Sequence, residues 1–145
     1  MSGSVRVNLA DMLPAKRMLD RLSRIQTARL LDILGSEAES QVRRRIRDEK
    51  TGPDGVAWAP WSKAYEEQRP NKGGILELGG DLGDSITYEV GNDAVEVGSN
   101  LIYALVHNEG FEEMHIPERR YLGVSPENLS DLGELVIEFL AREAA

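Results

Sequence analysis

Two histidines lie among glutamates in the last third of the chain, a combination that can bind metal or transfer protons. His107 and His115 flank Glu109, Glu112 and Glu113, and both side-chain types serve as zinc ligands and as acid–base groups. Their spacing matches neither HExxH nor another zinc pattern. We therefore expect a hydrogen-bonded structural role for His107, an exposed loop position for His115, and neither a metal ligand nor a catalytic residue.

Other signatures of catalysis and cofactor binding are missing from the sequence. No GxSxG context, which exposes a nucleophile, surrounds Ser85, Ser99 or Ser125. The pairs Gly73-Gly74 and Gly79-Gly80 are not followed by the Lys-Ser/Thr of a phosphate-binding loop. The chain has no cysteine, which excludes a thiol nucleophile and a disulfide framework. We expect no enzyme and no cofactor; a small hydrolase using His107 with Glu109 is the least favoured alternative.

A run of arginines at 43–47 is the segment best suited to meet phosphate. The whole chain nevertheless carries a net charge of −8, whereas a nucleic-acid-binding surface is expected to be basic. Arg43, Arg44 and Arg47 are predicted to project from one side of a helix. We expect a solvated helix face or a partner contact there, with nucleic-acid binding as the weaker alternative.

The charge is distributed unevenly along the chain. Residues 1–50 carry 11 of the 17 basic and 7 of the 25 acidic side chains, a net charge of +4, which leaves −12 for residues 51–145. Two solvated faces of unlike sign are the simpler explanation. The alternative is head-to-tail association, because complementary charges steer assembly and such contacts close into rings when the rotation permits.

The hydrophobic pattern of the first third predicts a strand followed by helices. Val5, Val7 and Leu9 alternate with polar residues, as in a half-buried strand. Helical spacing then runs from Leu13 to Ile25, and the sequence leaves open whether this helix breaks near 23–27 or continues. Residues 27–49 predict a long helix with the apolar stripe Leu31, Leu34, Ala38, Val42 and Ile46. Arg45 falls at the edge of this stripe, and Gly35 within it marks a weak point or a close backbone approach.

The second half of the chain predicts shorter elements. Asp81 caps a helical turn, and alternation on either side of residues 91–93 predicts a β-hairpin. Residues 102–108 predict a short helix and 116–123 a last strand. Ser125 caps a final helix, whose expected buried stripe is Leu129, Leu132, Val136, Phe139 and Leu140. The fold class is therefore α+β, with an antiparallel sheet, a long N-terminal helix or helix pair, and a C-terminal helix.

Both tryptophans follow a cluster of turn-forming residues at 51–55. Trp58 and Trp61 are expected to anchor an irregular segment onto the core, and an interface anchor is the alternative, since tryptophan is enriched at binding hot spots. Residues 63–74 are polar and end in Gly73-Gly74, which predicts a flexible loop. The length of 145 residues predicts a single domain over 1–145.

Four segments, in order, resemble the motifs of the phage virion morphogenesis family of tail completion proteins. Residues 53–62 are similar to PDGxxWxPLS, 75–86 to ILxxTGxLxxSI, 97–110 to VGSNxxYAxxHxxG, and 116–125 to IPARPFLGLS. The resemblance covers about residues 5–140. The chain departs from these motifs at Trp61, Gly79, Glu118 and Arg120.

This resemblance implies a non-enzymatic phage neck protein with a fold similar to tail terminators. It implies tail completion and head–tail joining by a homo-oligomeric ring, a hexamer, between the head connector and the tail terminator or tail tube. Genomic DNA would pass through the lumen without specific binding. The protein would reside in the virion after assembly in the host cytoplasm, with no membrane partner. A tail terminator capping the tube, or an assembly chaperone absent from the virion, are the alternatives.

The expected interface residues combine the basic helix with the bulky motif positions. They are Arg43, Arg44, Arg47, Trp58, Trp61, Tyr103, His107, Arg119 and Tyr121. The acidic part of the chain is expected to border the DNA path and to meet the basic helix of a neighbouring copy. Repulsion would then let DNA slide, because phosphate contacts are what make DNA binding tight.

Overall fold

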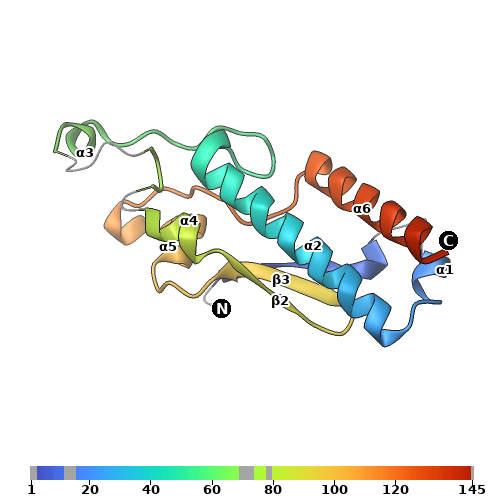
Figure 1. The fold of residues 1–145 in the computed structure, drawn as a ribbon. Helices are drawn as coiled ribbons and strands as arrows, with labels where there is room; N and C mark the ends of the chain where they lie inside the picture. The colour runs from blue at the N-terminus through green and yellow to red at the C-terminus, as the bar shows by residue number, and fades with distance from the viewer. Residues whose placement is uncertain (1–2, 12–15, 69–73, 78–79, 145) are drawn as a thin grey trace.

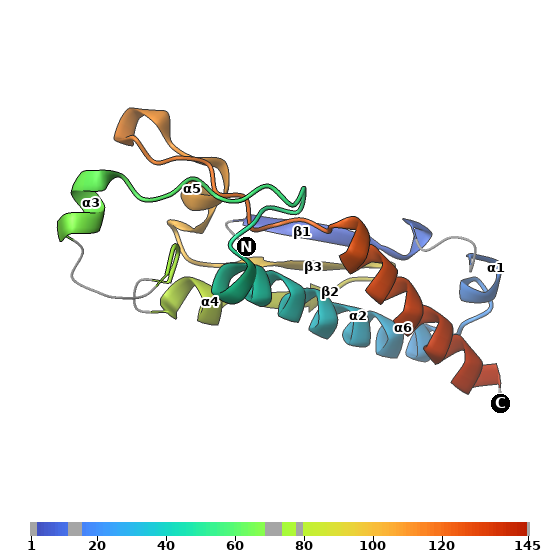
Figure 2. The same ribbon diagram turned by 90° about the horizontal axis from the view of Figure 1, so that it is seen from above.

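The computed structural model describes residues 3–11, 16–68, 74–77 and 80–144. Within these ranges the chain forms a three-stranded antiparallel sheet in the order β1-β3-β2, from β1 (Gly3–Asn8), β2 (Thr87–Val90) and β3 (Ala94–Ser99). Helix α2 (Arg24–Arg44) crosses one face of the sheet, and α6 (Pro126–Ala144) packs beside α2 (Figure 1 and Figure 2). The expected α+β class, with an antiparallel sheet, a long helix and a C-terminal helix, is confirmed.

The two faces of the sheet differ in polarity, as alternation along each strand requires. The face toward the helices carries Val5, Val7, Val95 and Val97. On the opposite face Glu89 of β2 lies directly across from Glu96 of β3, and Arg6 of β1 approaches Glu96 from the other side at 3.5 Å. The expected first strand and hairpin are therefore both present.

Helix α2 begins at a capping box, which separates it from the short helix α1 (Lys16–Leu19). The Ser23 hydroxyl accepts a hydrogen bond from the Gln26 amide at 3.2 Å, and the Gln26 side chain accepts one from the Ser23 amide at 2.9 Å. Such a box satisfies two backbone donors that a helix start leaves free. The open question of one helix or a pair is thus resolved in favour of a pair.

The buried stripe of α2 forms as predicted, and the helix continues past Arg44 as a π-helical turn, Arg45–Glu49. This turn ends at Lys50, which adopts a left-handed conformation with φ of 56°. At Gly35 the backbone approaches Tyr88 of β2 so closely that an added Cβ would overlap the ring. Gly35 is therefore the site of a close approach between helix and sheet.

Shorter helices lie at the end of the molecule away from α1 (Figure 1). They are α3 (Lys63–Gln68), α4 (Asp81–Ser85) and α5 (Ala104–Glu109), with a 3-10 turn at Glu112–Met114. Helix α3 occupies part of the segment expected to be a loop, and residues 69–73 lie outside the described ranges. The flexibility of 63–74 stays a prediction.

Two expectations about the C-terminal third are wrong. Residues 116–123 form no strand; the described chain has only an isolated bridge between Phe111 and Ile116 there. Backbone groups of this segment bond instead to side chains from elsewhere, including Asn108 and Arg45. Leu129, which was expected to be buried, lies in the first turn of α6 and is 42% exposed.

Candidate functional site

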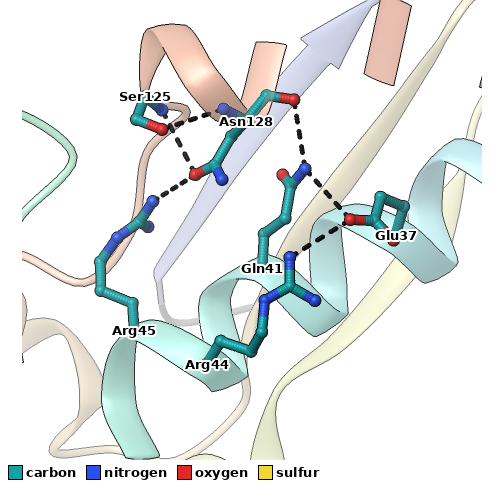
Figure 3. Close-up of polar contacts among 6 residues, drawn as sticks. All are labelled: Glu37, Gln41, Arg44, Arg45, Ser125 and Asn128. Carbon is teal, nitrogen blue, oxygen red and sulfur yellow. Dashed lines mark hydrogen bonds and ion pairs between the residues drawn. The ribbon is translucent and has the colours of Figure 1, made fainter. Parts of the chain in front are cut away.

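A fully buried arginine joins the end of α2 to the segment that leads into α6. The Arg45 guanidinium donates to the carbonyl oxygens of Tyr121 at 2.6 Å and Gly123 at 3.2 Å. It also donates to Asn128 Oδ1 at 2.6 Å, as Figure 3 shows. Its Nε finds no hydrogen-bond partner in the described chain. Burial lowers the pKa of Arg45 from its ordinary value. The hydrogen bonds of this cation are accepted by neutral oxygens, and they fix the approach of residues 121–128 to α2.

The same junction continues along α2 through amide contacts. Gln41 Nε2 donates to the Asn128 carbonyl at 3.1 Å and to Glu37 at 3.4 Å, and Arg44 contacts the same Glu37 carboxylate at 3.3 Å (Figure 3). Asn128 is itself placed by Ser125, whose hydroxyl accepts from the Asn128 amide at 3.0 Å as the start of α6 requires. The predicted Ser125 cap is confirmed. It positions Asn128, whose side-chain oxygen accepts from Arg45.

The segment around Trp58 is tied to residues 119–120 by side-chain donors. Trp58 is buried, and its indole nitrogen donates to the Arg120 carbonyl at 2.9 Å. Arg119 donates in return to the carbonyls of Ala59 at 2.8 Å and Pro60 at 3.0 Å. The expected anchoring role of Trp58 is confirmed.

Helix α5 is tied to the same segment through Asn108 and Tyr121. The Asn108 side-chain oxygen accepts from the amides of both Tyr121 and Leu122 at 3.0 Å. The buried Tyr121 hydroxyl donates to the Ala104 carbonyl at 2.5 Å, and burial raises the pKa of Tyr121. These bonds and those of Trp58 bring three of the four motif segments, 53–62, 97–110 and 116–125, into one junction with α2.

Aromatic side chains gather at the surface of this junction, around Arg119; we call them the aromatic patch. The Trp61 and Tyr65 rings lie 6.1 Å apart, and Tyr103 meets His107 edge-on at 5.8 Å. The Arg119 amide donates to the His107 carbonyl at 3.0 Å, while its guanidinium holds the backbone next to Trp61. Tyr65 and Tyr103 are about two-fifths exposed, at 42% and 41%. The patch therefore combines rigid support with accessible aromatic surface.

Comparison with known proteins gives this arrangement a context. The sequence profile of the phage virion morphogenesis family matches residues 10–141. The chain belongs to this family. It is also 29% identical over 133 residues to the protein described as putative capsid assembly protein G of Escherichia phage Mu, a match that covers 83% of this chain and 85% of that protein. No solved structure matches the chain.

Membership of the phage virion morphogenesis family makes this chain a structural or assembly protein of virion formation. Among the residues described, no group of three His, Asp or Glu side chains gathers as metal ligands would. In the same part of the chain, every helix is too short or too polar to span a lipid bilayer.

The expected interface residues of this family member divide between its surface and its interior. Trp58, Arg119 and Tyr121 are buried, with at most 7% exposure, whereas Tyr103 is exposed and Trp61 is half-buried. The buried residues hold the backbone on which the exposed residues stand. An interface role for the set stays a prediction.

The arginines of the basic helix are engaged within the subunit. Arg43 pairs with Glu39 at 2.5 Å and donates to the Ile86 carbonyl at 2.7 Å. Arg47 pairs with Asp84 at 2.5 Å, and Arg44 pairs with Glu37 at 3.3 Å. Contact of these arginines with a partner also stays a prediction, since acids of the same chain already balance their charges.

The exposure of the two histidines is as expected, but the hydrogen bonding of His107 is not. His115 is exposed and has a φ of 56°. His107 is half-buried, and its Nδ1 has no partner in the described chain, so this nitrogen does not form the expected hydrogen bond. Burial lowers the pKa of His107, and the nearby Arg119 guanidinium lowers it further.

Sequence reasoning missed the importance of Arg45, Asn108 and Asn128. The position of Arg45 at the edge of an apolar stripe was a signal of burial. The two asparagines gave no signal, because Asn108 bonds backbone amides and Asn128 bonds the Arg45 guanidinium, and these partners lie far away in the sequence.

Proposed function

We propose that this member of the virion morphogenesis family acts at the phage neck as a homohexameric ring that completes the tail and joins it to the head. Genomic DNA would pass through the lumen without specific binding. The head connector and the tail terminator or tail tube are the proposed neighbours. The observation that carries the proposal is the convergence of three motif segments on one junction that displays the aromatic patch.

The composition of the aromatic patch supports a contact with another protein. Tryptophan, tyrosine and arginine are enriched at the residues that dominate protein–protein affinity. Here they stand on a backbone held by Asn108 and Arg119, so little side-chain and loop freedom is lost on binding. Preorganisation of this kind strengthens an interface without enlarging it.

The internal pairing of the basic helix supports passage of DNA without adhesion. Phosphate binding depends on free Lys and Arg side chains. The arginines at 43–47 are paired or buried, and residues 51–145 carry a net charge of −12, with 6 of the 17 basic and 18 of the 25 acidic side chains. A lumen bordered by this part of the chain would repel the duplex.

Deletion of the gene, with complementation from a plasmid as the control, tests the proposal. We expect filled heads and tails of normal length that do not join, seen by electron microscopy, and this chain in the mass spectrum of purified wild-type virions. Tails of uncontrolled length would instead indicate a tail terminator. Absence from the virion would indicate an assembly chaperone, a role also compatible with the capsid-assembly description of the Mu relative. Normal infectious particles from the deletion strain would refute all three roles.

A second experiment separates the aromatic patch from the rest of the surface. Joint replacement of Tyr65 and Tyr103 by alanine should reduce phage titre at least about tenfold, because exposed aromatic anchors carry much of an interface's affinity. The matched control is Ile137→Ala, which removes an exposed apolar side chain from α6. Equal titres of the two variants would refute a role for the patch.

A further inference from the structure

The two ends of the subunit differ in charge. Helix α1 and the start of α2 lie at one end, and the 3-10 turn Glu112–Met114 lies at the other, close to α5 (Figure 1 and Figure 2). The central part of the molecule separates the two in both views. Any contact between these ends must therefore be made with a different copy.

The first end carries what we call the basic-end patch, made of Arg17, Met18, Arg21, Arg24 and Ile25. Its three arginines are exposed, and none forms an ion pair with another described residue. Met18 is 48% and Ile25 75% exposed. The patch thus joins three arginines, against the single exposed carboxylate of Asp20 in the same segment, to accessible apolar surface.

The second end carries the acid-end patch, made of Glu109, Phe111, Glu112, Glu113 and Met114. Its three glutamates are exposed and, across the described ranges, form no ion pair. Phe111 is 40% and Met114 66% exposed.

The loop that bears the acid-end patch is closed on itself. The Phe111 amide donates to the Ile116 carbonyl at 2.8 Å, and the Ile116 amide donates back at 3.0 Å. Gly110, at a φ of 80°, turns the chain away from α5, and a Cβ there would overlap the backbone of Glu118. The acid-end patch is therefore presented on a braced projection that needs little ordering before it binds.

We propose that the acid-end patch of one copy docks on the basic-end patch of the next. Each patch offers three like charges and two apolar side chains, and the two are opposite in sign. The occupant is a second copy because both halves of the complementary pair are present on the same chain. The contact is heterologous, so repetition produces a closed ring or an open filament. This inference rests on the proposed ring and names the surfaces that would build it.

Purified full-length chain tests the contact through its oligomeric state, measured by analytical ultracentrifugation. We expect the wild type to self-associate at low ionic strength and to dissociate at about 1 M salt, where exposed charges are screened within about 3 Å. The double variant Arg21→Glu, Arg24→Glu should associate at least about 100-fold more weakly, since like charges would then meet. It should still fold, because an acidic residue at the start of α2 is favourable to the helix.

The reciprocal variant Glu112→Arg, Glu113→Arg should lose self-association to the same extent. A mixture of the two double variants should assemble again, because acidic ends of one variant then face basic ends of the other at every contact. The matched control is Glu66→Arg, Glu67→Arg on α3, which makes the same charge change on exposed residues at the same end of the molecule. Association of this control should stay within about threefold of the wild type.

Three results would overturn the inference. They are a wild-type chain that stays monomeric, an oligomer indifferent to the reversals, and failure of the mixture to assemble. None of them decides the neck role, which depends on the particles made by the deletion strain. Unjoined heads and tails together with a monomeric chain would preserve the head–tail joining role but remove both this contact and the proposed ring.

Discussion

Two arginine-rich regions of this chain, residues 17–24 and residues 43–47, have opposite fates in the fold. In the second region Arg45 is buried and its neighbours are paired with acids of the same subunit. In the first region, no arginine forms an ion pair within the described residues. The density of positive charge along this sequence therefore does not show which charges are available to a partner.

The difference follows from what each region faces. The end of α2 lies over α4 and the segment leading to α6, where carbonyl groups and carboxylates accept its arginines. The first region lies before α2 crosses the sheet, at the end of the molecule (Figure 1). A partner search should therefore start from residues 17–24 rather than from the longer arginine run.

The largest effect expected on stability is that of Arg45→Met. The change leaves the carbonyls of Tyr121 and Gly123 and the side chain of Asn128 without their donor, and each buried acceptor left unsatisfied costs about 1–3 kcal/mol. We expect the free energy of unfolding, from urea titration, to fall by about 3 kcal/mol or more. Arg44→Met, which removes an exposed pair, is the control and should cost less than about 1 kcal/mol. Similar losses for the two would contradict the comparison.

Arg43→Met should have an intermediate effect. This side chain is half-buried and donates to the carbonyls of Gly83 and Ile86, which tie α2 to α4 and the sheet. We expect a loss of about 1.5–3 kcal/mol in the same urea titration, because hydrogen bonds that involve charged groups contribute about that much. A loss below that of Arg44→Met would show that these backbone contacts are replaced by water.

Ser23→Ala tests the boundary between the two regions. The change removes the hydroxyl that caps α2, and loss of such a cap costs about 1 kcal/mol. Thermal unfolding followed by circular dichroism should show this decrease, while Ser23→Asp, which can still accept the bond, should retain stability. If the Ser23→Ala and Ser23→Asp variants were equally stable, the capping box would not define the start of α2.

The smallest effect on stability belongs to the joint change Arg21→Glu, Arg24→Glu. Exposed charges without ion pairs contribute little to folding, so the free energy of unfolding of the monomer should change by no more than about 0.5 kcal/mol. The same variant should lose self-association. A large loss of stability would mean that these arginines hold their own subunit together, as those at 43–47 do.

Periodicity made several elements predictable. The stripe of α2, the hairpin and the capped start of α6 all leave a local pattern of apolar residues, turns and caps, and the structure contains each of them. The family motifs marked the three segments that meet at the junction with α2. These features depend on residues close together in sequence.

The features that the sequence did not predict depend on hydrogen bonds between residues far apart in the chain. Arg45 and Tyr121 are separated by 76 positions, and nothing near either one announces the other. Residues 116–123 were predicted as a last strand, but their amides and carbonyls bond to side chains instead of to a neighbouring strand. The aromatic patch depends on Arg119 and Trp58, which join two segments that the sequence keeps about sixty residues apart.

The polar face of the sheet limits how copies of this protein can meet. Strand β2 is a four-residue edge, and its Glu89 lies directly across from Glu96 of β3. A strand added at this edge would bring further side chains beside two carboxylates that already repel each other. Short, charged edges of this kind resist sheet-to-sheet growth. Crowded copies would thereby avoid fibrous aggregates and keep their ends free for ordered contacts.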